Sequence, residues 1–122
     1  MRCMSSKILL IEDEPSLRKN LELLLTMERY AVTTAADGVD GLRYLQEERF
    51  DLVITDVMMG EVSGFDVLEH ISTHHPDTPV ILFTGYGTND LRQEALRKGA
   101  YRCIPKPFDV EDFLTVVRKA LS

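Results

Sequence analysis

Residues 51–59 read DLVITDVMM, and the position of one charge in this stretch decides how the fold is interpreted. Leu52, Val53 and Ile54 are apolar at successive positions, which is typical of a buried strand in a parallel sheet that helices cover on both faces. The run leads directly into a carboxylate, Asp56, with further apolar residues behind it. Because an ionised group is costly to bury without a partner, a charge at this place needs an explanation.

Comparable apolar runs recur along the chain roughly every 20 to 30 residues. The expected strands are Lys7–Ile11, Tyr30–Ala35, Leu52–Thr55, Val80–Phe83 and Tyr101–Ile104. Between them lie stretches in which apolar residues keep a helical spacing, the first of them after Pro15. The other expected helices are Val39–Glu48, Phe65–His75, Asn89–Lys98 and Val110–Leu121. This alternation predicts an α/β fold, in which right-handed crossovers build an open, doubly wound parallel sheet.

The length of 122 residues suits one domain, with residues 1–6 as an N-terminal tail and no output domain in this chain. Acidic residues outnumber basic ones by 20 to 14, and the net charge of −6 argues against contact with nucleic acid. No apolar run approaches the ~20 residues of a membrane span, and no secretory leader is visible, so we expect a cytoplasmic protein without a membrane contact. Cys3 and Cys103 have neither metal-ligand spacing nor a disulfide pattern, which predicts free thiols.

Polar residues stand at the ends of four of the five expected strands. Glu12 and Asp13 follow the first strand, Asp56 ends the third, Thr84 ends the fourth, and Lys106 follows the fifth. In a parallel sheet these carboxyl ends meet at one edge, where the functional crevice of an open α/β sheet lies. We therefore predict that three carboxylates, a hydroxyl and an ammonium group converge there.

Three converging carboxylates need a counter-charge. Two like charges about 4 Å apart repel by roughly 4 kcal/mol at an effective dielectric constant near 20, in a domain with only ~5–15 kcal/mol of stability. Lys106 supplies one positive charge, and a hard divalent cation such as Mg²⁺, which prefers oxygen ligands, suits the rest. A carboxylate beside such a cation can be a nucleophile toward phosphorus. Taken singly, Asp13 could instead cap a helix, Asp56 could cap a turn, and Lys106 could be a solvated surface residue.

Four motifs, in order, make the chain resemble the receiver domains of two-component response regulators. They are ILLIEDEP at 8–15, DLVITDVMM...SGFDVL at 51–68, PVILFTGYG at 79–87 and GAYRCIPKPF at 99–108. The resemblance covers nearly the whole chain and implies a flavodoxin-like (βα)₅ fold with strand order 2-1-3-4-5. It also implies a phosphorylation-gated signalling switch that catalyses its own phosphorylation and slow dephosphorylation and is not otherwise an enzyme.

The resemblance implies a role for each residue of the acidic set. Asp56 corresponds to the phospho-acceptor, which receives the phosphoryl group from the phosphohistidine of a sensor histidine kinase. Glu12 and Asp13 correspond to the acidic pair that holds Mg²⁺ together with Asp56. The main-chain carbonyl of Met58 corresponds to a further metal ligand.

The last two motifs match the family in part. Thr84 corresponds to the hydroxyl that moves to meet the phosphoryl group, and Lys106 to the family's lysine, whose peptide bond to Pro107 is cis in the family. Three residues before this lysine the family usually has a switching aromatic, whereas this chain has Cys103; Tyr101 lies on the same side of the strand but earlier. We therefore expect Cys103 to pack as a small apolar side chain and the switch to be muted or different.

Two further positions tune the attack of water on the phosphorylated aspartate in this family. They lie two residues beyond Asp56 and two beyond Thr84, and here they carry Met58 and Tyr86. Because both side chains are bulky, we expect slow autodephosphorylation.

His70 and His74 have an i, i+4 spacing that could hold a transition metal. The pattern offers no third ligand nearby. We therefore expect solvent-exposed histidines close to a helix C-terminus.

Other functions stay open beside the receiver. A haloacid-dehalogenase-like phosphatase would need a second acidic residue where Met58 stands, and a flavin- or nucleotide-binding module would need a glycine-rich loop after the first strand. A third alternative is a pseudo-receiver that acts only as an interaction module and does not depend on phosphorylation. The presence of Cys103 in place of the family's usual aromatic residue supports this alternative. As partners, the resemblance implies the sensor kinase, a covalently linked output domain absent from this chain, and a homodimer through the fourth helix, fifth strand and fifth helix.

Overall fold

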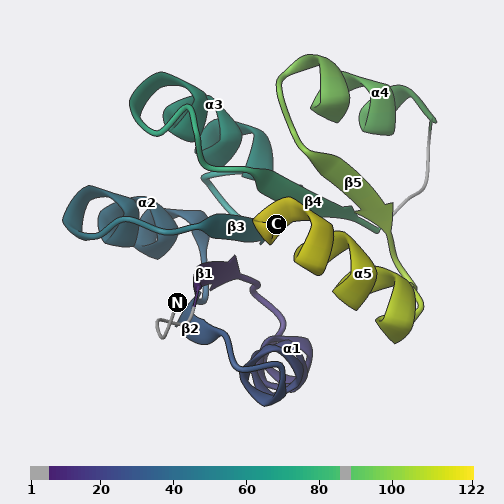
Figure 1. Cartoon of the computed structure of the whole chain (residues 1–122). Coiled ribbons are helices and arrows are strands. Elements are labelled where there is room, and N and C mark those ends of the chain that lie inside the picture. Colours follow the sequence, from purple (N-terminus) through teal and green to yellow (C-terminus); the bar gives the residue numbers. More distant parts are fainter. Residues whose placement is uncertain (1–5, 86–88) are drawn as a thin grey trace.

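A computed structural model describes residues 6–85 and 89–122 of the chain. Strands and helices alternate along these residues, and the sheet lies between two groups of helices (Figure 1). The elements are β1 (Lys7–Ile11), α1 (Pro15–Met27), β2 (Ala31–Ala35), α2 (Gly38–Glu47), β3 (Leu52–Asp56), α3 (Gly64–His74), β4 (Val80–Thr84), α4 (Asn89–Arg97), β5 (Arg102–Pro105) and α5 (Val110–Leu121). The predicted α/β alternation is confirmed. Among the described residues no helix is long and apolar enough to cross a lipid bilayer.

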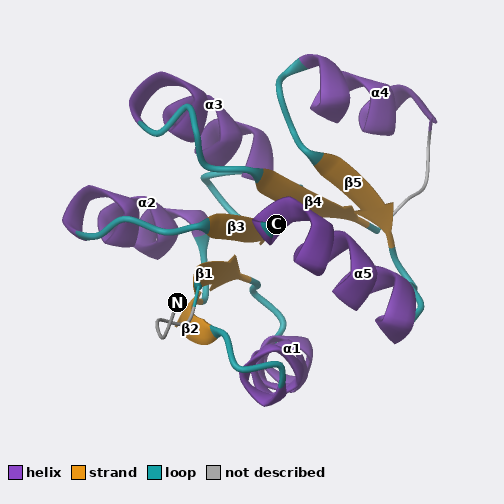
Figure 2. Ribbon diagram, in the orientation of Figure 1, coloured by secondary structure: helices purple, strands orange, loops and turns teal. Residues whose placement is uncertain are grey.

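The sheet has the strand order β2-β1-β3-β4-β5, and every neighbouring pair is parallel. The order 2-1-3-4-5 that the resemblance implied is therefore confirmed. Helices α1 and α5 cover one face of this sheet, and α2, α3 and α4 cover the other (Figure 2).

Burial on both faces explains why the strand sequences are apolar at successive positions. In β1, Leu9 and Ile11 pack in the core cluster beneath α2, α3 and α4, whereas Ile8 and Leu10 pack in the cluster beneath α1 and α5. Neighbouring side chains of a strand point to opposite faces, so a strand with two covered faces has no side chain that faces water. The same reasoning applies to β3 and β4, which are buried along their whole length and carry polar residues only at their carboxyl ends.

Local hydrogen bonds determine where the helices begin. Helices α2 and α3 each begin one residue before the start that the sequence predicted. Helix α1 is capped by Glu14, whose carboxylate accepts from the main-chain N–H groups at the helix start, so the interpretation of Asp13 as the cap is wrong. Helix α2 begins at Gly38 because Asp37 caps it. Helix α3 begins at Gly64 because Ser63 and Asp66 form a reciprocal capping box.

Several strand and helix ends also shift by one residue. Arg29 has a positive φ of 72°, which closes helix α1 and delays β2 until after Tyr30. Strands β3 and β4 extend through Asp56 and Thr84, and β5 starts after Tyr101. These extensions matter because they bring the polar residues into the regular ladder of the sheet.

Candidate functional site

The carboxyl ends of four strands bring the site residues together. Glu12 directly follows β1, Asp56 and Thr84 are the last residues of β3 and β4, and Lys106 directly follows β5. In the register of the sheet Asp56 pairs with Phe83, the neighbour of Thr84, so the ends of β3 and β4 lie side by side. The fold therefore places residues from distant parts of the chain at one edge.

Three carboxylates form an acidic cluster at this edge, which we define as Glu12, Asp13 and Asp56. Each offers one oxygen, and these oxygens lie within 4.8 Å of one another, a spacing at which they could hold a metal ion. Glu12 is only 1% exposed and Asp56 is also buried, whereas Asp13 is open to solvent. Over residues 6–85 and 89–122 no other group of three such ligands meets this spacing.

Lys106 is the cation that faces this cluster. Its Nζ donates a hydrogen bond to Glu12 Oε1 at 3.1 Å and a second one to Asp56 Oδ2. The ammonium group also lies 5.6 Å from the centroid of the Phe83 ring. One positive charge thus bridges the two buried carboxylates, and the interpretation of Lys106 as a solvated surface lysine is wrong.

The environment shifts two pKa values in this group. Burial raises the pKa of Glu12, and the hydrogen bonds from the Glu14 N–H and from Lys106 offset only part of that rise. Burial alone would lower the pKa of Lys106, but its hydrogen bonds and charge attraction to Asp56 and Glu12 raise it overall. Lys106 therefore stays charged, while Glu12 holds a proton more readily than an ordinary glutamate.

Main-chain groups orient the carboxylates. The Met58 N–H donates to Asp56 Oδ1 at 3.2 Å, so Asp56 does cap a turn in addition to facing Lys106. The Glu14 N–H donates to Glu12 Oε2 at 3.1 Å, and Arg18 Nη1 donates to the Glu12 main-chain oxygen at 2.9 Å. The sequence did not predict that Glu14 and Arg18 contact Glu12. The available signal was their place in or next to the first turn of the helix that starts at Pro15.

Thr84 and Pro107 lie on either side of Lys106. Thr84 is buried at the end of β4, and its main-chain oxygen accepts a hydrogen bond from the Lys106 N–H at 2.8 Å. The Lys106–Pro107 peptide bond is cis. Beyond it the Phe108 ring stacks on Phe83 with centroids 4.9 Å apart, which anchors the loop after Lys106 to the core.

The positions that depart from the family pattern lie in different environments. Cys103 is 2% exposed and belongs to the core cluster beneath α2, α3 and α4, where burial raises the pKa of its thiol. Tyr101 is exposed and lies outside β5. Met58 is 65% exposed beside Asp56, and Tyr86 lies outside the described residues.

An apolar groove of about 420 Å³ adjoins Lys106. Leu17 and Leu24 of α1 form one wall, and Pro107, Phe108 and Val110 form the other. The site is thus an acidic, lysine-bridged edge with an apolar surface beside it.

An open parallel sheet of this order, with an acidic cluster and a paired lysine at its carboxyl edge, defines a flavodoxin-like α/β protein with a cation-binding edge. The model of the response regulator receiver domain matches residues 8–118, and the chain belongs to this family of two-component systems.

Curated relatives agree with this assignment. The chain is 38% identical over 115 residues to the transcriptional regulatory protein GlrR of Escherichia coli (strain K12), which covers 94% of this chain and 26% of the relative. It is 37% identical over 116 residues to the response regulator ArlR of Staphylococcus aureus (strain Mu50), covering 95% of this chain and 52% of the relative. The chain therefore spans between a quarter and about half of the length of these relatives.

Solved structures share the fold. A response regulator receiver domain protein from Clostridium thermocellum is 35% identical with a TM-score of 0.89, covering 95% of this chain and 94% of that one. The chemotaxis protein CheY4 of Vibrio cholerae is 31% identical with a TM-score of 0.89, covering 97% of this chain and 100% of that one.

Proposed function

We propose that residues 1–122 form one receiver domain, in which Asp56 accepts a phosphoryl group from the phosphohistidine of a sensor histidine kinase. The observation that carries this proposal is the pairing of the buried Asp56 carboxylate with Lys106 beside Glu12 and Asp13. A merely structural aspartate at a strand end would not need two further carboxylates at such close spacing.

The residues of the acidic cluster fit a hard divalent cation. They supply oxygen ligands only, and one lysine does not balance three carboxylates. We propose that Glu12, Asp13, Asp56 and the main-chain carbonyl of Met58 hold Mg²⁺. When bound, Mg²⁺ supplies positive charge that offsets the charge developing on the phosphoryl oxygens.

In the proposed reaction an Asp56 carboxylate oxygen attacks phosphorus, the new P–O bond forms, and the P–N bond to the kinase histidine breaks. Lys106, held charged by its carboxylate partners, stabilises the negative charge of the transferring group. Thr84 then meets the phosphoryl group from the neighbouring strand end. The protein's contribution is mostly positioning and electrostatic stabilisation.

Cys103 bears on how the protein responds to phosphorylation, because it stands where the family usually has a switching aromatic residue. Because this buried residue offers no ring to rotate, we propose a muted switch compared with receivers that have an aromatic there. A structure with a phosphate mimic tests this. Concerted movement of Thr84 and a buried aromatic ring of β5 would contradict it.

Two surfaces support the proposed partners. The groove between α1 and the Phe108 loop adjoins Lys106, so we propose that the kinase docks an apolar surface there. Leu96 of α4 and Tyr101, next to β5, are exposed and support a homodimer through α4, β5 and α5. The greater length of the relatives supports an output domain joined to this chain.

The test is the intact mass of the protein after incubation with acetyl phosphate and Mg²⁺. We expect a gain of one phosphoryl group, which EDTA or Asp56→Asn abolishes. Asp77→Asn, at an exposed aspartate of the opposite sheet edge, serves as the matched control and should be phosphorylated normally. No gain in the wild type would contradict the proposal and favour the pseudo-receiver.

A further inference from the structure

One peptide bond joins two of the three carboxylates of the acidic cluster, those of Glu12 and Asp13. Glu12 is held firmly: its N–H donates to the Ala35 main-chain oxygen at 3.0 Å, and its carboxylate accepts from the Glu14 N–H and from Lys106, each at 3.1 Å. The exposed Asp13 carboxylate, by contrast, has no hydrogen bond or ion pair within residues 6–85 and 89–122. Its position in the cluster therefore depends on the backbone that leads into it.

Arg18 holds the carbonyl group of this peptide bond. Its Nη1 donates to the Glu12 main-chain oxygen at 2.9 Å, so the side chain reaches back across the start of α1. Because a peptide unit is planar, a fixed Glu12 oxygen also fixes the direction in which the chain enters Asp13. That direction keeps an oxygen of Asp13 within 4.8 Å of oxygens of Glu12 and Asp56. Arg18 thus supports the one carboxylate of the cluster that no side chain holds.

The charge of Arg18 does not neutralise the acidic cluster. Arg18 is half-buried, and in the described part of the chain it forms no ion pair, whereas Lys106 pairs with both Glu12 and Asp56. A guanidinium group carries five N–H donors in a rigid plane, which suits it to hold a carbonyl oxygen in one direction. Its positive charge, however, would repel a cation at the cluster. The hydrogen bond and the charge of Arg18 therefore act on a cation site with opposite signs.

We propose that Arg18 is a positioning residue for Mg²⁺ binding, which acts by orienting the peptide between Glu12 and Asp13 and not by its charge. This role rests on the proposed function, since it concerns the cation that the acidic cluster would hold. Loss of the charge alone should tighten cation binding, because a like charge is removed. Loss of the orientation should weaken it. The sign of the change in affinity therefore separates the two roles.

The experiment is a titration of the unphosphorylated protein with MgCl₂, followed by nuclear magnetic resonance of the Asp13 and Met58 amides. Arg18→Met should weaken Mg²⁺ binding by about tenfold, as is typical when a residue that orients a metal ligand is removed. Arg18→Ala should weaken it to the same extent. Because Arg18 is only half-buried, neither substitution is expected to unfold the chain.

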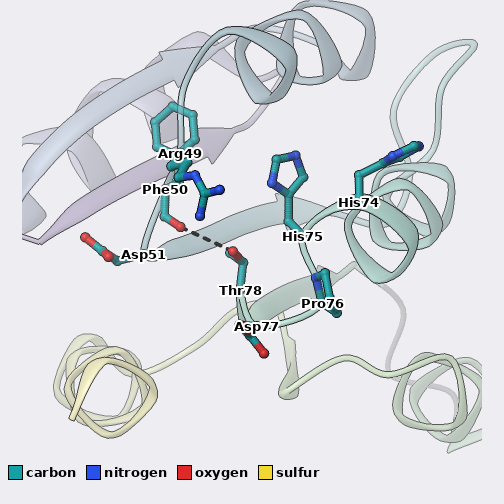
Figure 3. Close-up of a pocket in the computed structure, with 8 residues that line it drawn as sticks. All are labelled: Arg49, Phe50, Asp51, His74, His75, Pro76, Asp77 and Thr78. Carbon is teal, nitrogen blue, oxygen red and sulfur yellow. Dashed lines mark hydrogen bonds between the residues drawn. The ribbon is translucent and has the colours of Figure 1, made fainter.

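Arg49→Met is the matched control. Arg49 precedes the amino end of β3, whereas Asp56 ends that strand, and it lines a pocket of about 490 Å³ together with Asp51 and Asp77 (Figure 3). The substitution removes the same charge and the same donors from the opposite edge of the sheet. It should leave the affinity for Mg²⁺ unchanged.

The Mg²⁺ dependence of phosphorylation by acetyl phosphate excludes a merely structural role. We expect Arg18→Met to raise the half-saturating Mg²⁺ concentration by the same factor, while the rate at saturating Mg²⁺ stays close to that of the wild type. A merely structural role would lower the saturating rate instead. The proposal is overturned if Arg18→Met binds Mg²⁺ as tightly as the wild type or more tightly. Absence of Mg²⁺ binding in the wild type would overturn the proposed metal site as well, so the two failures are distinguishable.

Discussion

Gly64 lies so close to Asp56 that a Cβ built on the glycine would be 2.3 Å from the main-chain oxygen of the aspartate. The Gly64 N–H also donates to the Val57 main-chain oxygen at 2.9 Å, which ties the start of α3 to the end of β3. The backbone that carries Asp56 is thus held by direct contact with a helix, and this contact needs a residue without a side chain.

Gly64→Ala is expected to lower the free energy of unfolding by about 1–3 kcal/mol, because the added methyl group meets backbone atoms that cannot turn away. Urea denaturation measures this change. Gly85→Ala is the matched control, since a Cβ at Gly85 meets nothing within 4 Å. Equal stability of the two variants would show that α3 and β3 can separate without cost.

The raised pKa of Glu12 predicts a pH dependence of stability in the metal-free protein. Because its pKa is higher in the folded chain than the ordinary value of about 4.5, the folded protein holds a proton that the unfolded chain has lost. The resulting stability is present below the unfolded pKa and is lost as pH rises through the folded one. Relative to Glu12→Gln, the wild type should therefore gain stability as pH falls from about 7 toward about 4.5. Denaturant titrations in EDTA at several pH values measure this difference, and parallel curves would contradict the prediction.

Met58→Asn should speed the loss of the phosphoryl group severalfold, because a short amide beside Asp56 can hydrogen-bond an attacking water where the exposed thioether side chain cannot. The decay of the phosphorylated species, followed by intact mass, measures the rate. Met27→Asn replaces a similarly exposed methionine on α1, 70% exposed against 65%, and should have no effect. If Met58→Asn combined with Tyr86→Ala leaves the decay unchanged, bulk at these positions does not control it.

Cys103 should react slowly with a thiol reagent in the native protein, since its side chain is buried and its raised pKa keeps the thiolate scarce. In a Cys3→Ser background we expect a rate at least about a hundredfold below that in urea. Rapid labelling under native conditions would show that β5 opens readily, which would also weaken the assignment of Cys103 to the core.

Leu17→Glu should impair phosphotransfer from the kinase while leaving phosphorylation by acetyl phosphate intact, because the substitution charges the groove without touching the acidic cluster. Leu23→Glu offers the comparison, as Leu23 is an exposed leucine of the same helix that does not line the groove. Parallel assays with the two phosphodonors separate docking from chemistry. Equal loss with both donors would show that Leu17 affects the reaction itself.

Much of the fold follows from the sequence because burial on both faces leaves a plain signal. Runs such as Leu52–Ile54 predict covered parallel strands, and the order of strands then brings Asp56 and Lys106 to one edge. Helix starts were less predictable, because Glu14 and Asp13 are adjacent carboxylates and only the backbone geometry decides which one caps α1. The ends of the helices and strands therefore differ from the prediction by a residue or so, whereas the order of the elements and of the strands in the sheet agrees with it.

Contacts made by side chains across loops could not be predicted. Nothing in the spacing shows that Arg18 reaches the Glu12 main-chain oxygen. The i, i+4 rule covers His70 and His74 but not His75, whose ring approaches His70 only because the helix ends there. Such contacts depend on where the chain turns, and the position of a turn is hard to predict from a single sequence.

Lys106 lies just after the last strand, 94 residues from Glu12 and 50 from Asp56. During synthesis from the N-terminus both carboxylates leave the ribosome long before their lysine does. A nascent chain at that stage has the two carboxylates without the ammonium group that pairs with both of them. The order of the strands therefore leaves the buried carboxylates of Glu12 and Asp56 without their bridging cation until β5 has joined the sheet.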